Sequence, residues 1–190
     1  DMLRQAIALD AQAAPFYQEL GVVLGKAGLL EKAAELFRWA LVLQPEYPEA
    51  INNLGVILRR AGEVGEAETC FRRALSWNPL LADAYNNLGL VLAEDVPRQE
   101  EALQCFQKAV KLEPLKANMQ YNLALALKNR HEFKEAEACL QQARQLKEEF
   151  FEADFSIAEL YLLQGRYELG WDKYDALRLL GKRQGQLPLP

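Results

Sequence analysis

The sequence has little of what metal sites, disulfide scaffolds and redox centres are built from. Its 190 residues include only three cysteines, one histidine and two methionines. A disulfide framework needs more cysteines, and a zinc site needs cysteine and histidine at close spacing. Neither pattern occurs here, so we expect no metal and no cofactor.

Long apolar runs and an excess of positive charge are also missing. No stretch approaches the ~20 consecutive apolar residues of a membrane-spanning helix, and no signal peptide opens the chain. Lysine and arginine number 22 against 27 aspartate and glutamate, which gives a net charge of −5. Such a balance argues against a surface that follows nucleic-acid phosphates. We therefore expect a cytoplasmic protein with neither a nucleic acid nor a membrane as partner.

Catalytic motifs are absent as well. The sequence has no phosphate-binding loop and no nucleophile elbow. Its one histidine, His131, falls in a predicted turn without an acidic partner. Cys70, Cys105 and Cys139 share one repeat position, where helices packed ~8–10 Å apart hold them too far apart for a disulfide. We interpret the cysteines as half-buried packing residues and expect no enzymatic activity.

What the sequence does contain is a repeat of about 34 residues. The string Asn-Asn-Leu-Gly occurs at 52–55 and again at 86–89. Small residues recur in register with it, at Gly21, Gly55, Gly89, Ala124 and Ala158. A second small column holds Ala33, Ala67, Ala102, Ala136 and Gly170, and a bulky column holds Phe37, Phe71, Phe106, Leu140 and Tyr174. Self-similarity at this period indicates a stack of similar structural units.

Each unit is predicted to be a pair of helices. Apolar residues follow the helical period from Ile51 to Leu58 and again from Ala67 to Leu75. Between the two stretches lies Gly62, a residue suited to ending a helix. Pro45, Pro79 and Pro114 follow the second helices, which proline cannot continue. The third unit has one extra residue in its turn, around Asp95-Val96-Pro97.

These markers divide the chain into five units and two ends. The units are residues 14–47, 48–81, 82–116, 117–150 and 151–184. Residues 1–13 match only a second helix, and residues 185–190 read as a tail or linker. We expect further repeats before residue 1 in the natural protein, and self-association through the apolar N-terminal end that a missing first helix leaves exposed.

The glycine column predicts a close contact between helices. Glycine inside a helix costs roughly 1 kcal/mol relative to alanine, so a packing requirement must offset that cost. Alanine replaces glycine in the last two units, which indicates that small size is required and a left-handed backbone is not.

The pattern resembles the tetratricopeptide repeat. Leu54-Gly55, Leu58, Ala67, Phe71, Ala74 and Pro79 match that motif position for position. The resemblance implies an all-α, right-handed superhelical solenoid, in which the first helices line a concave groove that binds peptides or proteins. An alternative, RNA binding by pentatricopeptide-type repeats of nearly the same period, is disfavoured by the acidic charge and by the small-residue columns.

The predicted groove residues lie on the first helices, away from their core stripe. They are Gln18, Val22, Asn52, Asn53, Val56, Arg59, Arg60, Asn86, Asn87, Leu90, Tyr121, Asn122 and Leu125. Asn53, Asn87 and Asn122 occupy one repeat position, and an asparagine amide can pair with any peptide backbone. A similar asparagine ladder lines the repeats of O-linked N-acetylglucosamine transferases. The alternative is that these amides face solvent or bond locally.

A second resemblance lies in the last unit. Tyr167, Gly170-Trp171 and Tyr174-Asp175 are similar to the closing repeat of bacterial proteins that continue into a glycosyltransferase domain, although Arg178 stands one residue later than in that pattern. This makes a substrate-recruiting arm of such an enzyme the alternative to a non-catalytic binding scaffold. For the physical role of Trp171 and Tyr174 we favour sealing of the last hydrophobic layer.

Overall fold

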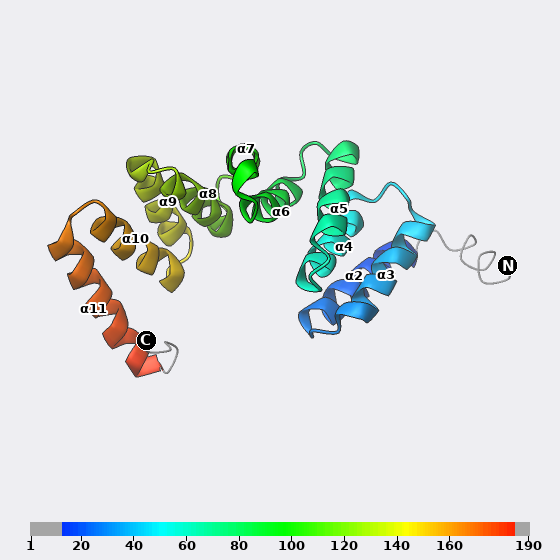
Figure 1. Cartoon of the computed structure of the whole chain (residues 1–190). Coiled ribbons are helices and arrows are strands. Elements are labelled where there is room, and N and C mark those ends of the chain that lie inside the picture. Colours follow the sequence, from blue (N-terminus) through cyan, green and yellow to red (C-terminus); the bar gives the residue numbers. More distant parts are fainter. Residues whose placement is uncertain (1–12, 185–190) are drawn as a thin grey trace. The chain divides into compact units, whose positions relative to one another are not determined.

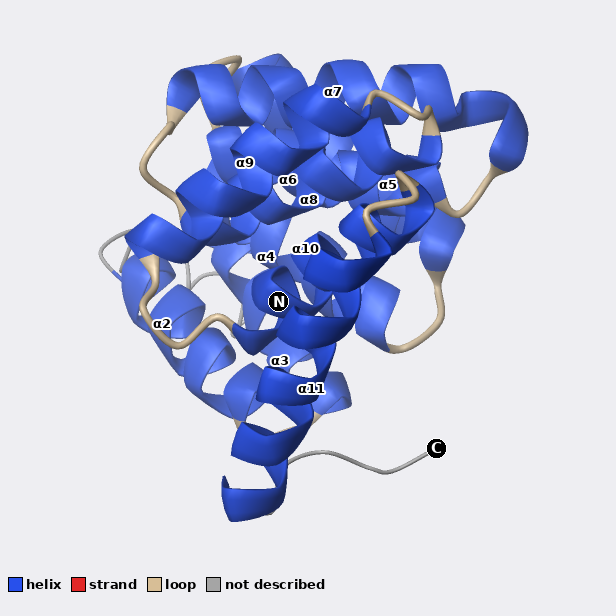
Figure 2. Ribbon diagram, turned by 90° about the vertical axis from the view of Figure 1, so that its left-hand side faces the viewer, coloured by secondary structure: helices blue, strands red, loops and turns tan. Residues whose placement is uncertain are grey.

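The computed structural model describes residues 13–184, the last seven by their backbone alone. Ten α-helices and one 3-10 helix account for the secondary structure of this range, and no strand occurs within it (Figures 1 and 2). The all-α fold predicted from the sequence is therefore confirmed. The predicted N-terminal partial repeat, apart from its last residue Ala13, and the self-association ascribed to it lie outside the described residues, as does the 185–190 tail.

The chain divides into two compact units, the first comprising residues 1–112 and the second residues 113–190. The helices of the first unit are α2 (Ala13–Lys26), α3 (Leu30–Leu43), α4 (Pro48–Arg60), α5 (Val64–Trp77), α6 (Ala82–Ala93), the 3-10 helix η1 (Val96–Arg98) and α7 (Gln99–Leu112). Within it α2 packs on α3, α4 on α5 and α6 on α7, and each pair stacks on the next (Figure 1).

The second unit holds two helix pairs of the same kind. Its helices are α8 (Ala117–Asn129), α9 (Phe133–Leu146), α10 (Phe151–Leu163) and α11 (Tyr167–Gln184). Helix α8 packs on α9 and α10 on α11, and α10 also contacts α9. The three second helices of the first unit, α3, α5 and α7, each end two residues before a proline, as at Leu43 before Pro45.

Four of the five turns inside the helix pairs share one backbone conformation. Their left-handed residues are Gly28, Gly62, His131 and Gly165, with φ of 82°, 88°, 62° and 74°. Each turn is closed by a bond across five residues, such as that from the backbone N–H of Glu63 to the carbonyl of Leu58 at 2.9 Å. The extra residue predicted in the third turn is accommodated by η1. His131 is confirmed as an exposed turn residue, at a position that favours glycine.

Within each glycine-containing pair, the helices approach so closely that a side chain larger than hydrogen does not fit. A methyl group at Gly55 would lie 2.7 Å from Cε1 of Phe71, and one at Gly89 would lie 2.7 Å from Cε1 of Phe106. The prediction of a close helix contact is thus confirmed. Where alanine replaces glycine, at Ala124, the aromatic column holds the smaller Leu140.

The cysteine column packs as predicted. Cys105 is buried, Cys70 and Cys139 are half-buried, and all three are free thiols. Burial raises the pKa of each thiol, that of Cys105 to about 11, so all three are protonated at neutral pH. They therefore act as small apolar residues.

The glycine–phenylalanine contact predicts a specific response to added volume. Gly55→Ala should lower the free energy of unfolding by roughly 1–2 kcal/mol, although alanine favours helix, because its methyl group overlaps the Phe71 ring. The matched control is Gly65→Ala on α5, where no atom lies within 4 Å and φ is not positive. That control should leave stability unchanged or raise it. Denaturant titration of both variants measures the difference, and equal midpoints would contradict the prediction.

Candidate functional site

The first helices of the N-terminal unit form one continuous surface. Helix α4 contacts both α2 and α6 directly, so that residues at equivalent positions of the three helices lie next to one another. We call this surface the first-helix face. Its predicted residues are Gln18, Val22, Asn52, Asn53, Val56, Arg59, Arg60, Asn86, Asn87 and Leu90.

The structure divides these residues by exposure. Asn52 and Asn86 are buried, with 6% and 5% of their surface exposed, which the sequence did not predict. Asn53, Asn87 and the apolar residues Val22, Val56 and Leu90 are half-buried, and Arg60 is exposed. The open part of the face is therefore an apolar strip flanked by amides and arginines.

One amide pair bonds across neighbouring repeats. Nδ2 of Asn87 donates to Oδ1 of Asn52 at 3.0 Å, between α6 and α4. For these two residues the local-bonding interpretation is correct. Asn53 makes no side-chain hydrogen bond within the described residues. Both its amide donors and its acceptor are available to a ligand, whereas Asn87 keeps one donor and its Oδ1.

The C-terminal unit repeats this link with different groups. Tyr121 and Ser156 occupy the repeat positions of Asn52 and Asn87, and Oγ of Ser156 donates to the hydroxyl of Tyr121 at 3.4 Å. The two links share a separation of 35 residues. Polar residues 35 positions apart on the first helices were the sequence signal for these links, and the sequence analysis did not identify it. The remaining predicted residues of this unit, Asn122 and Leu125 on α8, are half-buried.

The two neighbouring arginines of α4 differ in their partners. Nη1 of Arg60 donates to the carbonyl of Gly25 at 2.7 Å and so caps the end of α2. Nε of Arg59 is buried and has no acceptor within the described residues. The first-helix face thus carries one arginine engaged by the backbone and one whose Nε–H has no hydrogen-bond partner there.

The closing motif of the last unit is only partly a packing feature. Gly170 is buried, and a methyl group there would lie 2.6 Å from Cδ2 of Leu162. Tyr174 is half-buried, with its ring 5.5 Å from that of Phe155. Trp171, by contrast, is 55% exposed, so the expectation that it seals the last layer is wrong. It occupies the position of Glu68 and Glu137, which meet residues of the following repeat.

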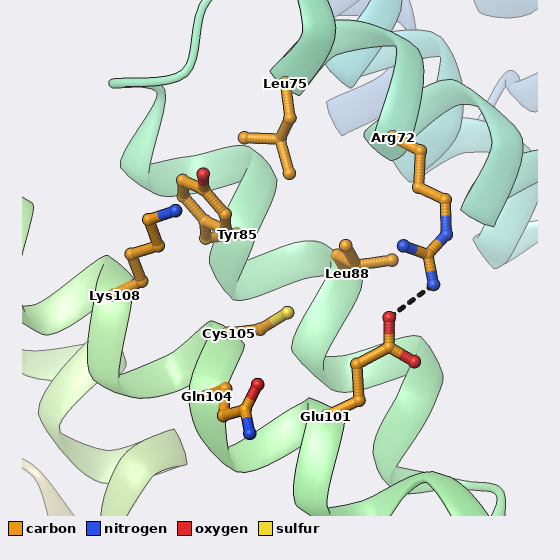
Figure 3. A pocket seen from close by; sticks show the side chains of 8 residues that line it. All are labelled: Arg72, Leu75, Tyr85, Leu88, Glu101, Gln104, Cys105 and Lys108. Carbon is orange, nitrogen blue, oxygen red and sulfur yellow. Dashed lines mark hydrogen bonds and ion pairs between the residues drawn. The ribbon is translucent and has the colours of Figure 1, made fainter.

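A hollow of about 330 Å³ lies on the second-helix side of the N-terminal unit (Figure 3). Residues of α5, α6 and α7 form its walls. Its lining residues are Arg72, Leu75, Tyr85, Leu88, Glu101, Gln104, Cys105 and Lys108. Sequence reasoning did not identify it, because its walls come from helices of two different repeats.

Most charged groups in this hollow and beside it are paired with one another. Arg72 contacts Glu101 at 2.6 Å, and Arg98 contacts Glu68 at 2.6 Å. The hydrogen bond from Arg98 is the largest cause that lowers the pKa of Glu68, to about 2. Nζ of Lys108 lies 4.7 Å from the centre of the Tyr85 ring. This arrangement ties the second helices together and leaves little unsatisfied charge for a ligand.

Within residues 13–184, acidic, histidine and cysteine side chains nowhere gather in threes that could hold a metal ion. Over the same range, no helix combines the length and the apolar character that crossing a membrane requires.

Comparison with known proteins agrees with the repeat pattern. Residues 27–147 match the family of the cilia and flagella-associated protein 70 middle TPR-like domain, and residues 121–183 match a tetratricopeptide repeat family. No curated protein sequence matches the chain.

Among solved structures, PilF of Pseudomonas aeruginosa is similar over 94% of this chain and 78% of its own, with 24% identity and a TM-score of 0.80. A thermophilic TPR protein of Thermus thermophilus shares 28% identity over 87% of this chain and 90% of its own, with a TM-score of 0.71. YrrB, described as a TPR protein with an unusual peptide-binding site, shares 21% identity over 96% and 98%, with a TM-score of 0.69. These likenesses confirm the helical solenoid.

The ion pair of Glu68 predicts an acid-sensitive contribution to stability. Its folded pKa of about 2 lies below the ordinary value of 4.5, so the contribution is complete above pH 4.5 and is lost as pH falls toward 2. Glu68→Gln should cost on the order of 1 kcal/mol at pH 7 and make the decline below pH 4.5 shallower. Urea titrations between pH 2 and 7 measure both effects. The control Glu66→Gln, at an exposed position of the same helix, should reproduce the wild-type pH curve.

The amide pair predicts different effects on stability for Asn53 and Asn87, which occupy the same position in neighbouring repeats. Asn87→Ala leaves the buried Oδ1 of Asn52 without its donor and should cost about 1–3 kcal/mol of unfolding free energy. Asn53→Ala removes no hydrogen bond to a described residue and should change stability by less than about 0.5 kcal/mol. Thermal or denaturant unfolding distinguishes them. A stability loss at Asn53 as large as at Asn87 would show that both amides are structural.

Proposed function

The chain belongs to the family of the cilia and flagella-associated protein 70 middle TPR-like domain, and from this membership we propose that it is a non-catalytic scaffold that holds an extended peptide or a partner protein on its first helices. The five repeats are assigned as residues 14–47, 48–81, 82–116, 117–150 and 151–184. The protein is proposed to act in the cytoplasm without a cofactor.

The observation that carries the proposal is the open part of the first-helix face. Val22, Val56 and Leu90 form an apolar strip that crosses the first helices of three successive repeats, and each is only half-buried. Beside the strip, Asn53 forms no side-chain hydrogen bond to the described part of the chain. An apolar strip next to an available amide group suits an extended peptide, because some of its side chains can pack on the strip while a backbone N–H or C=O group bonds the amide.

The spacing of the strip supports an extended ligand. Neighbouring packed helices lie about 8–10 Å apart, and one turn of an extended polyproline II chain, three residues long, spans about 9 Å and returns to the same side. A peptide laid across α2, α4 and α6 would therefore place every third side chain on successive strip residues. That a structural relative, YrrB, is described as having a peptide-binding site is consistent with this use of the fold.

The C-terminal unit is proposed to contribute a similar surface of its own. Tyr121, Asn122 and Leu125 occupy on α8 the positions that Asn52, Asn53 and Val56 occupy on α4. All three are half-buried.

The second candidate function is a substrate-recruiting arm of a glycosyltransferase whose catalytic domain follows residue 190. The exposed Trp171 favours it, because an uncovered indole in the last repeat suits contact with a further domain. The gene sequence downstream of the Pro190 codon distinguishes the two functions. A glycosyltransferase domain there would support the second candidate.

The proposal predicts that Asn53 contributes to binding and not to folding. Asn53→Ala should weaken the binding of extended, unstructured peptides by about 0.5–1.5 kcal/mol, because one backbone hydrogen bond is lost. Isothermal titration with a panel of apolar-patterned decapeptides measures the change. The control is Asn129→Ala, an exposed asparagine at the end of α8 that is outside the predicted surface. Equal affinities of wild type and Asn53→Ala would remove the amide from the site, and no binding of any peptide would contradict the proposed function.

A further inference from the structure

Arg59 is a charged residue whose surroundings do not neutralise it. It lies in the last turn of α4, and its side chain is partly buried. Within residues 13–184 its Nε has no hydrogen-bond acceptor, and none of the described carboxylates forms an ion pair with its guanidinium. Partly burying a cation without an anion is unfavourable. The site therefore has an unmet requirement for a negatively charged partner.

In the C-terminal unit, the residue at the same repeat position as Arg59 does have a negatively charged partner. Lys128 corresponds to Arg59, and its Nζ contacts Oε2 of Glu159 at 2.7 Å. Glu159 lies 31 residues further along, on the first helix of the next repeat. The residue 31 positions after Arg59 is Leu90, which has no charge. The position that supplies the carboxylate in one unit thus supplies an apolar side chain in the other.

The neighbouring arginine, Arg60, does have a hydrogen-bond partner. Arg60 donates to the carbonyl of Gly25 at 2.7 Å, and the rest of its side chain is exposed. The two residues carry the same charge one position apart, so Arg60 is a matched control for Arg59.

We propose that Arg59 is a specificity-determining residue that binds the carboxylate of an aspartate or glutamate side chain in an extended peptide lying across Val56 and Leu90. The inference rests on the proposed peptide-binding function and names the ligand class of that site. Val56 precedes Arg59 by three residues and therefore lies beside it on the same side of α4. An acidic residue flanked by apolar residues then places its carboxylate at the guanidinium and its neighbours on the strip.

The chemistry of arginine suits this role. A guanidinium presents five N–H donors in a planar fork and binds a carboxylate through two parallel hydrogen bonds. Its charge persists at every physiological pH, so the preference for acidic residues should persist until the ligand carboxylate is protonated. Because the pair would be partly buried, dissolved salt should weaken its attraction less than that of an ion pair exposed on the surface.

The test uses the full chain and two synthetic decapeptides. Both peptides carry valine at every third position and amidated C-termini, and they differ only in one central residue, glutamate in one and glutamine in the other. Wild type should bind the glutamate peptide roughly 10-fold or more tightly than its twin, as expected for a charge-assisted pair. Arg59→Gln should abolish that ratio, and Arg60→Gln should reduce it by less than about threefold.

A second pair of variants tests the geometry without touching Arg59. Leu90→Glu places a carboxylate where Glu159 stands relative to Lys128, so it should neutralise Arg59 internally and remove the preference for the glutamate peptide. Leu90→Gln, of the same size without charge, should retain the preference. Loss of the preference in both variants would show that Leu90 acts only through packing and would overturn the assignment of Arg59.

The outcomes separate this inference from the proposed function. If both peptides bind wild type equally, the inference fails and the peptide-binding function stands. If neither binds, both fail. If a third peptide with glutamine and a free C-terminus binds as tightly as the glutamate peptide, the partner is a terminal carboxylate and the assignment to an acidic side chain is wrong. If Arg59→Gln and Arg60→Gln lower the preference equally, the preference comes from the general positive charge of this surface and the proposal is wrong.

Discussion

The close approach of the two helices in each pair is the constraint on which the rest of this structure depends. Where the first helix carries glycine, an aromatic ring from the second helix fills the space that a side chain would take. This contact fixes how each first helix is rotated about its own axis. The rotation in turn decides which residues meet the next repeat and which stay open on the first-helix face. The core and the first-helix face are thus two sides of the same helices.

The helix pairs, their turns and the small-residue columns could be predicted because they depend on local periodicity and residue size. The glycine of the Asn-Asn-Leu-Gly string needed only the cost of glycine in a helix to indicate a close contact. The burial of Asn52 could not be predicted in this way. It depends on how far α4 is rotated toward α6, and a difference of one residue position separates Asn52 from the open Asn53. Periodicity alone does not resolve such a difference.

Contacts between repeats were harder to predict than contacts within them. The partner of Arg98 is Glu68, 30 residues away, and the partner of Lys128 is Glu159, 31 residues away. Each depends on the stagger of two helices that are not consecutive in the chain. Trp171 illustrates the same point, since its column holds Ala34, Glu68, Leu103 and Glu137 in the other repeats and gives no consistent signal of burial. The open amide of Asn53 and the uncompensated charge of Arg59 depend on where the side chains of neighbouring helices lie, which sequence periodicity does not give.

The polar links between neighbouring first helices bear on how such a chain can be recombined. An amide joins Asn87 to Asn52, whereas hydroxyl groups join Ser156 to Tyr121. Each link needs one polar residue from each of two neighbouring repeats. A repeat in the middle of the chain therefore contributes one residue to the link before it and another to the link after it. Duplicating the repeat that contains Tyr121 beside itself would pair a tyrosine with Asn122 in place of Ser156. The repeats therefore share a fold, while the chemistry of each junction depends on which two repeats meet there.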